Sequence, residues 1–181
     1  MTLKLVLASH NQGKLAEMRA ILEPAVPGLE LVAYDGPEPI ENGTTFLENA
    51  LIKARAANLH TGLPAIADDS GLAVELLAGG RDNVESRRLL LRQLADIPDE
   101  HRGAAFICTI ALVDGDSEVS FSGNWPGVVA REERGEHGHG YDPIFVPEGF
   151  EQTAAELEPE LKNAFSHRSQ ALGQLIRFLN A

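Results

Sequence analysis

The stretch Ala65-Ile66-Ala67-Asp68-Asp69-Ser70-Gly71-Leu72 is an apolar run that ends in two adjacent acids. A short apolar run predicts a buried β-strand, and Asp-Ser-Gly is typical of a turn, so we expect the strand to end near Ser70. Neighbours on a strand point to opposite faces, so Asp68 and Asp69 can share one site only if the strand ends there. Buried carboxylates need partners. The segment therefore predicts either a cation site at a strand end or an ordinary turn stabilised by aspartate.

Apolar and helical patterns alternate on both sides of this stretch. We expect strands at 3–8, 29–34, 104–113, 118–129 and 143–146, and helices at 14–22, 45–60, 83–94 and after Ser166. Thr45 and Glu48 have capping-box spacing at the second helix, and Asp114-Gly115-Asp116 predicts a hairpin turn. This order predicts an α/β fold with a mixed sheet. Neither a repeat nor a polar linker interrupts it, so residues 1–181 are expected to form one domain.

The composition limits which partners the protein is expected to bind and indicates the compartment in which it works. The formal net charge of -12 opposes binding to DNA or RNA, whose backbone attracts clustered Lys and Arg. The apolar runs are shorter than the roughly 20 residues of a membrane span. Cys108 is the only cysteine, so an internal disulfide is impossible and a reducing cytoplasm is the expected compartment.

The loop Ser9–Gly13 joins the first expected strand to a helix that begins near Lys14. Backbone N–H groups at a helix N-terminus bind anions, and Lys14 adds a full positive charge. The spacing is not that of a Walker A loop, because the earlier glycine is missing and Leu15 follows Lys14. A phosphate site and an ordinary capped loop both fit this segment.

Three polar side chains form one stripe of the second expected helix, since Thr45, Asn49 and Lys53 are four residues apart. Glu41 precedes this helix, where an acid suits either the helix dipole or a metal. A solvated helix face is the alternative explanation for Lys53.

Polar side chains also gather in the C-terminal third. His137 and His139 are too few for a zinc site without a third ligand. Lys162, His167 and Arg168 surround a predicted helix start, and such donors suit an anion or the polar edge of a base. Helix capping and surface charge explain them equally well.

Together and in this order, these segments closely resemble the inosine triphosphate pyrophosphatase family. The matching segments are ASHNQGK, ENGTTFLENALIKA, ADDSGL, FSGNWPGVVARE, GHGYDPIFVPEG and KNAFSHRSQAL. The resemblance implies Mg²⁺-dependent hydrolysis of the purine nucleoside triphosphates ITP, dITP and XTP to the monophosphate and pyrophosphate, which cleans the nucleotide pool. It also implies an elongated mixed sheet flanked by helices, two lobes with a central cleft, and a homodimer. From the net charge and the short apolar runs we expect binding neither to nucleic acid nor to membrane.

The resemblance also assigns roles to residues. Glu41 and Asp69 should hold Mg²⁺, and the catalytic residues should be Asp69 as proton acceptor, Lys53, and Asp68 beside the metal. Binding of the triphosphate falls to Ser9, His10, Asn11, Gln12, Gly13 and Lys14, with Ser70 also touching substrate. The base pocket should consist of His139, Gly140, Tyr141, Asp142, Lys162, His167 and Arg168. These roles suit phosphoryl chemistry, which needs positioning and charge neutralisation more than covalent catalysis.

Two departures from the family pattern stand out. Gly80 is followed at once by Arg81, where the family has a longer loop resembling PGVYSAR. Either the protein has a true deletion here, or a segment of it is missing from this sequence, and we favour the missing segment. His139 stands where the family usually has phenylalanine, and an imidazole offers a base less stacking area. Two rival functions are a nucleotide sensor, which would need neither Glu41 nor Asp69, and a pyrophosphatase for modified pyrimidines.

Overall fold

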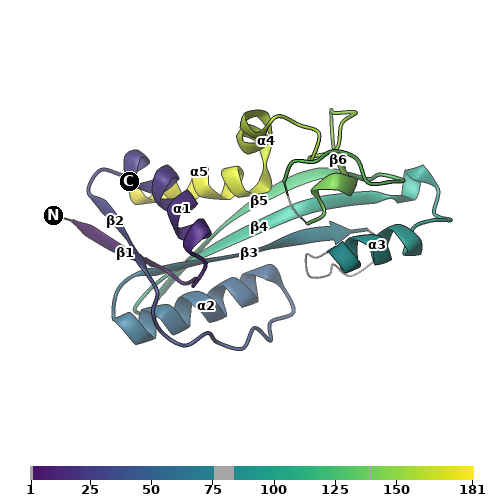
Figure 1. Cartoon of the computed structure of the whole chain (residues 1–181). Helices are drawn as coiled ribbons and strands as arrows, with labels where there is room; N and C mark the ends of the chain where they lie inside the picture. The colour runs from purple at the N-terminus through teal and green to yellow at the C-terminus, as the bar shows by residue number, and fades with distance from the viewer. Residues whose placement is uncertain (1, 76–83, 139) are drawn as a thin grey trace. The chain divides into compact units, whose positions relative to one another are not determined.

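The computed structural model describes residues 2–75, 84–138 and 140–181, and Figure 1 shows their course. The strands are β1 (Leu3–Leu7), β2 (Leu29–Ala33), β3 (Ala65–Val74), β4 (Gly103–Asp114), β5 (Ser117–Val129) and β6 (Phe145–Pro147). The α-helices are α1 (Gln12–Ala25), α2 (Phe46–Thr61), α3 (Val84–Gln93), α4 (Pro159–Phe165) and α5 (His167–Leu179). Short 3₁₀ turns cover Asp99–His101 and Asp142–Ile144.

The strands form one mixed sheet in the order β2-β1-β3-β4-β5-β6, which confirms the predicted fold class. β1 pairs in parallel with β2, from Leu3 opposite Leu29 onward, and with β3, where Val6 lies opposite Ala65. β5 pairs antiparallel with β6. Parallel pairing sends the loops after β1 and β2 out at one edge of the sheet, and these loops carry most of the predicted phosphate and metal residues.

The chain divides into two compact units, and each is discontinuous in sequence. Unit 1 comprises Met1–Asp69, Thr109–Ser122 and Ala171–Ala181, and unit 2 comprises Ser70–Cys108 and Gly123–Gln170. The chain passes from one unit to the other inside β3, β4, β5 and α5.

Unit 1 has helices on both faces of its part of the sheet, with α2 on one face and α1 and α5 on the other (Figure 1). The buried face of α2 consists of Ala50, Ala54 and Ala57. Alanine brings no bulky side chain, so the helix can lie close to the strands, where Ala50 and Ala54 join Ala67 of β3 in one cluster. The predicted capping box is confirmed, because Thr45 and Glu48 exchange their two hydrogen bonds at the start of α2.

Unit 2 has its own apolar core, to which β3, α3, β4, β5 and β6 all contribute. Its buried members are Leu72, Val74, Leu90, Leu94, Phe106, Trp125, Val129, Tyr141, Ile144, Phe145, Ala154 and Leu157. A buried cation also belongs to this unit: Arg102 donates hydrogen bonds to the carbonyl oxygens of Leu94, Val129 and Ala130. Burial lowers the pKa of this guanidinium, with Arg131 acting in the same direction.

Two local predictions need correction, one helix was missed, and one prediction lies beyond the described part of the chain. The turn expected at Ser70-Gly71 is wrong, because β3 continues to Val74. The short strand begins at Phe145, after a 3₁₀ turn, and helix α4 was not predicted. The Gly80–Arg81 junction lies outside the described residues. Among the described residues, the structure contains no helix long and apolar enough to cross a membrane.

Candidate active site

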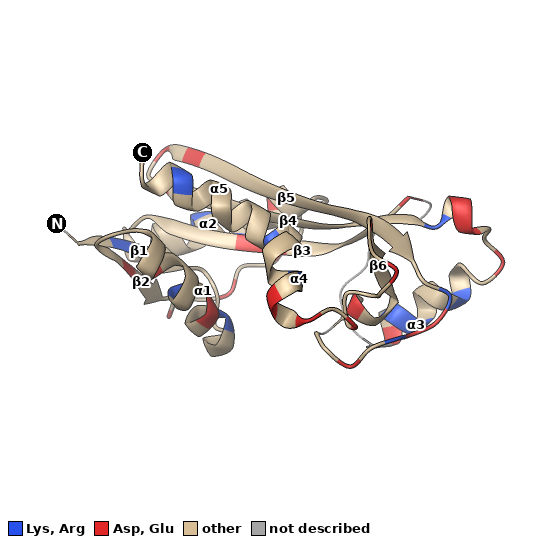
Figure 2. Cartoon of the chain, turned by 90° about the horizontal axis from the view of Figure 1, so that it is seen from above, with Lys and Arg blue, Asp and Glu red and all other residues tan. Residues whose placement is uncertain are grey.

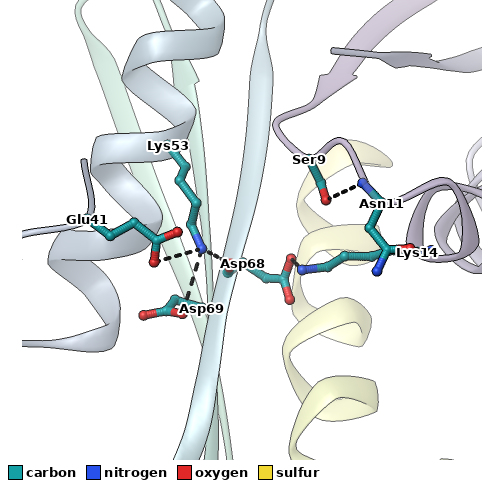
Figure 3. Close-up of polar contacts among 7 residues, drawn as sticks. All are labelled: Ser9, Asn11, Lys14, Glu41, Lys53, Asp68 and Asp69. Carbon is teal, nitrogen blue, oxygen red and sulfur yellow. Dashed lines mark hydrogen bonds and ion pairs between the residues drawn. The ribbon is translucent and has the colours of Figure 1, made fainter. Parts of the chain in front are cut away.

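The two adjacent acids of β3 point to opposite sides of the strand, as Figure 3 shows. This follows from the strand continuing past Ser70, because residues within a strand alternate between faces. The expectation that Asp68 and Asp69 turn toward one cation is therefore wrong. Each carboxylate has a lysine of its own, Lys14 for Asp68 and Lys53 for Asp69.

Asp68 is buried and lies against Lys14 of α1, with 2.5 Å between Lys14 Nζ and Asp68 Oδ1. The side chain of Asp68 is only 5% exposed and that of Lys14 is 25% exposed. A buried carboxylate this close to an ammonium group has the partner that burial requires. Asp68 thereby fixes the position of Lys14 at the start of α1.

On the other side of the strand, the ammonium group of Lys53 lies between two carboxylates. Lys53 Nζ is 3.7 Å from Glu41 Oε2 and 3.6 Å from Asp69 Oδ1, and it donates a hydrogen bond of 2.8 Å to the carbonyl oxygen of Asp68 (Figure 3). Glu41 comes from the loop after β2, Lys53 from α2 and Asp69 from β3. The structure thus brings together the two predicted metal ligands, Glu41 and Asp69, and places the Lys53 ammonium group between them.

The loop after β1 forms the N-terminal cap of α1. The Asn11 side chain accepts a hydrogen bond from the backbone N–H of Lys14, and the Asn11 N–H donates to Ser9 Oγ. Gln12 and Gly13 form the exposed first turn of the helix. The capped-loop explanation is therefore correct for Asn11. The other residues predicted to bind the triphosphate lie beside the N-terminus of α1, where anions can bind.

A pocket of about 150 Å³ lies within unit 1, between the loops after β1 and β2. Its lining includes the predicted residues Ser9, His10, Lys14, Glu41 and Lys53, together with Ala8, Tyr34, Glu38 and Pro39, which were not predicted. Both lysines face the same cavity, which suits a polyanionic ligand.

The loop that carries Glu41 is held to the start of α2 by side chains of that helix. Asn49 accepts a hydrogen bond from the Gly43 N–H, and Glu48 accepts from the hydroxyl and N–H of Thr44 and from the N–H of Thr45. These bonds, led by that from the Thr44 hydroxyl, lower the pKa of Glu48. Asn49, predicted only as part of a polar stripe, therefore serves the loop.

In unit 2 two of the predicted base-pocket residues, Asp142 and Lys162, form a second polar group. Lys162 of α4 lies 2.5 Å from Asp142 Oδ2, and both side chains are largely buried. Gly138 has φ of 75°, and a Cβ atom there would lie 2.1 Å from Asp142 Oδ2, so only glycine allows this approach. Tyr141 is buried in the core of the unit.

The next predicted pair, His167 and Arg168, begins helix α5. The His167 ring stacks on Phe106, with 4.9 Å between the centroids and 10° between the planes. Arg87 of α3 donates a hydrogen bond of 2.6 Å to the Gly140 carbonyl oxygen and so holds the loop before Tyr141. Phe106 and Arg87 carried no signal in the sequence. His139 lies outside the described residues.

The residues around Lys53 fit a hard divalent cation. Mg²⁺ is held by one or two carboxylates, with waters and substrate phosphates completing its shell, and Glu41 and Asp69 provide two carboxylates beside a carbonyl oxygen. Within the described ranges, three or more acids, histidines or cysteines nowhere gather into a metal-binding group. The donor set therefore fits a metal that shares its shell with substrate better than one held by protein alone.

A family model described as the Ham1 family matches residues 5–178. The chain belongs to the Ham1 family. It is 53% identical over 191 aligned positions to a dITP/XTP pyrophosphatase of Leifsonia xyli subsp. xyli, covering 98% of this chain and 96% of that protein. A dITP/XTP pyrophosphatase of Mycobacterium tuberculosis strain H37Rv is 49% identical over 195 positions, with the same coverage. These matches confirm the family resemblance found in the sequence.

Solved structures of the family share the fold. A HAM1 protein from Coxiella burnetii matches with a TM-score of 0.90 and 41% identity, over 98% of both chains. A nucleoside-triphosphatase / dITP/XTP pyrophosphatase from Mycobacterium abscessus matches with a TM-score of 0.83 and 48% identity, over 96% of this chain and 98% of that one. The alignment with the Leifsonia protein is longer than the 181 residues of this chain, so this chain is shorter than its relative at some internal point.

Proposed function

We propose that this protein hydrolyses ITP, dITP and XTP to the nucleoside monophosphate and pyrophosphate. The observation that carries the proposal is the group Glu41–Lys53–Asp69 beside Lys14, in a pocket at the edge where β1 and β2 end. The names of relatives about 50% identical agree with this activity.

The triphosphate would bind along the loop Ser9–Lys14. The backbone N–H groups at the start of α1 and the ammonium groups of Lys14 and Lys53 would attract phosphate oxygens. Ser9, His10, Asn11, Gln12 and Gly13 bring the chain around the anion, and Ser70 would touch substrate from β3. Asp68 acts through Lys14, which it holds in place, and we propose this positioning role instead of a place in the metal shell.

Glu41 and Asp69 would hold Mg²⁺, and this metal would neutralise phosphate charge and acidify a water molecule. Lys53 is then free to leave the two acids and to contact the phosphates. Asp69 would also accept a proton from the attacking water. Metal binding makes a carboxylate a weaker base. We therefore propose Asp69 first as a metal ligand and only second as the proton acceptor.

The base would bind in unit 2, near Gly140, Asp142, Lys162, His167 and Arg168, with Tyr141 supporting the loop from the core. Hypoxanthine and xanthine carry an oxygen at C6, where adenine carries an amino group. Arginine and a correctly oriented histidine present donors, which suit the oxygen and reject the amino group. His139 would stack on the base.

Three further proposals accompany this function. Residues 1–181 act as one nucleotide pyrophosphatase domain. The protein forms a homodimer, and it works in the cytoplasm on a small-molecule substrate.

Acidic and basic side chains are interspersed along the described elements (Figure 2), and the acids outnumber the basic residues. This distribution gives nucleic acid no net attraction.

Pyrophosphate release from ITP, XTP, dITP, GTP and ATP, with and without Mg²⁺, tests the function. We expect rapid release from the first three, and only with Mg²⁺. A nucleotide sensor would bind without turnover, but the two acids around Lys53 favour the enzyme, since a sensor needs neither. Equal turnover of modified pyrimidine nucleotides would favour the rival pyrophosphatase.

A further inference from the structure

Tyr34 comes directly after β2 and contacts side chains from two other elements. Its side chain is buried, with 5% exposure, yet it forms part of the wall of the pocket in unit 1. His10 stacks on the tyrosine ring, with 5.4 Å between the centroids and 15° between the planes. His60 of α2 meets the ring edge-on at 5.7 Å. Tyr34 therefore lies where three segments meet: the loop Ser9–Lys14, here called the phosphate loop, the loop after β2, and α2.

The loop after β2 wraps closely around this ring. Tyr34 Oη donates a hydrogen bond of 2.8 Å to the Pro37 carbonyl oxygen. Burial, and then the nearby Asp35, raise the pKa of Tyr34, which further favours the protonated hydroxyl that donates this bond. A Cβ atom on Gly36 would lie 2.4 Å from Tyr34 Oη and 2.6 Å from two ring carbons. Glycine at this position thus allows the backbone to pass over the tyrosine.

A second contact joins the same two loops at their surface. His10 Nδ1 lies 2.9 Å from Glu38 Oε1, which is a hydrogen-bond distance. The Glu38 side chain is 75% exposed, and exposed pairs of this kind contribute little. The buried ring of Tyr34 is therefore the stronger of the two links between the phosphate loop and the loop after β2.

Glu41 lies between two anchors of its loop. Tyr34 holds the loop at Pro37, and Asn49 holds it at Gly43. Glu41 itself is exposed, and its described contact is the ion pair of 3.7 Å with Lys53. The position of its carboxylate therefore depends on the two anchors, of which only the one at Gly43 belongs to the capping of α2.

We propose that Tyr34 is a positioning residue that sets Glu41 against the metal site by tying the loop after β2 to the phosphate loop through His10 and Pro37. The metal role of Glu41 rests on the proposed function. Tyr34 would touch neither the metal nor the reacting phosphate, so its effect should appear in metal affinity and loop order and not in turnover at saturation.

Tyr34→Leu and Tyr34→Phe in the full chain test this role. Amide hydrogen exchange reports local opening of residues 36–43 without any ligand. Tyr34→Leu removes both the hydrogen bond and the stack on His10, and we expect exchange in this loop to rise about tenfold or more. The Mg²⁺ concentration for half-maximal release of pyrophosphate from ITP should rise about three- to tenfold, with kcat at saturating Mg²⁺ within about twofold of wild type. Tyr34→Phe keeps the ring, so it should fall between wild type and Tyr34→Leu.

Phe178→Leu is the matched control, because it removes another aromatic contact of unit 1, the one between Phe178 and Phe121 at 5.5 Å. It should lower Tm without changing either measurement. The proposal is overturned if Tyr34→Leu leaves loop exchange unchanged, or if exchange rises equally throughout the protein. If the wild type releases no pyrophosphate, the proposed function fails, and loop exchange alone then decides whether Tyr34 holds the loop.

Discussion

Lys53→Gln should lower the stability of the metal-free protein and lower its Kd for Mg²⁺. Lys53 is the cation between Glu41 and Asp69 in the structure, so a metal that takes the same carboxylates must displace it. Removing the ammonium group leaves two acids facing each other without a counter-charge. The variant therefore loses stability without metal and regains it when Mg²⁺ binds, while turnover falls because the phosphates lose a positive charge.

The magnitude follows from the distances. At 3.6 and 3.7 Å, each ion pair has a Coulomb energy of about 4.5 kcal/mol at an effective dielectric constant of about 20. Desolvation and the ordering of the lysine offset most of this, since Glu41 is 37% exposed and Asp69 21%. A net contribution of about 1–2 kcal/mol is expected. Without metal, Tm should fall by about 2–8 °C, and the Kd for Mg²⁺ should fall about 5- to 30-fold.

Thermal melts over a range of Mg²⁺ concentrations, without nucleotide, measure both quantities. Lys14→Gln is the matched control, because Lys14 pairs with Asp68 on the other side of β3. It should lower Tm at least as much, because it removes the ammonium group that lies against a buried carboxylate, but it should change the Kd for Mg²⁺ by less than about threefold. If Lys53→Gln binds Mg²⁺ no more tightly than wild type, then Lys53 and the metal do not compete, and Glu41 with Asp69 is not the metal site.

Three other predictions concern single side chains. Asp69→Asn should abolish most turnover of ITP while Tm stays within a few degrees of wild type, because acids in active sites seldom add stability; an active, folded variant would remove Asp69 from the mechanism. Wild type should prefer ITP to ATP by roughly a hundredfold in kcat/KM, and Arg168→Ala should reduce this ratio by slowing ITP; an unchanged ratio would contradict the base-pocket assignment. The lowered pKa of Glu48 means that its capping bonds add stability above the ordinary pKa of glutamate, and that this stability is lost as pH falls through the lowered value. Glu48→Gln should therefore lose less Tm on acidification than wild type, and parallel losses in the two proteins would argue against the capping contribution.

Local signals in the sequence predicted most of the fold. They failed where tertiary contacts determine the conformation of a segment. The capping box at Thr45 and the hairpin around Gly115 depend on neighbours in sequence, and both are present. Asp-Ser-Gly has the composition of a turn, but β3 lies between β1 and β4 and remains extended through Ser70. Helix α4 has only 7 residues, too few to be stable without tertiary packing.

The same reason limits what the sequence says about the site. It predicted Lys14, Lys53, Asp68 and Asp69 as site residues but placed both acids beside one cation, and that arrangement depends on whether β3 ends or continues. Tyr34 reads in the sequence as the end of an ordinary strand, and the role we propose for it rests on the stacking of His10, distant in sequence, on its ring.

The passage of the chain between its two units inside β3, β4, β5 and α5 has a consequence for protein engineering. Domain boundaries normally fall in exposed linkers, where a chain can be cut or fused. Here neither unit is a continuous segment, so truncation cannot produce either one. A half-length fragment would also expose the open edges of broken strands, which favours aggregation. Chimaeras with other members of the Ham1 family should therefore exchange single loops, such as the one between β2 and α2, in place of whole units.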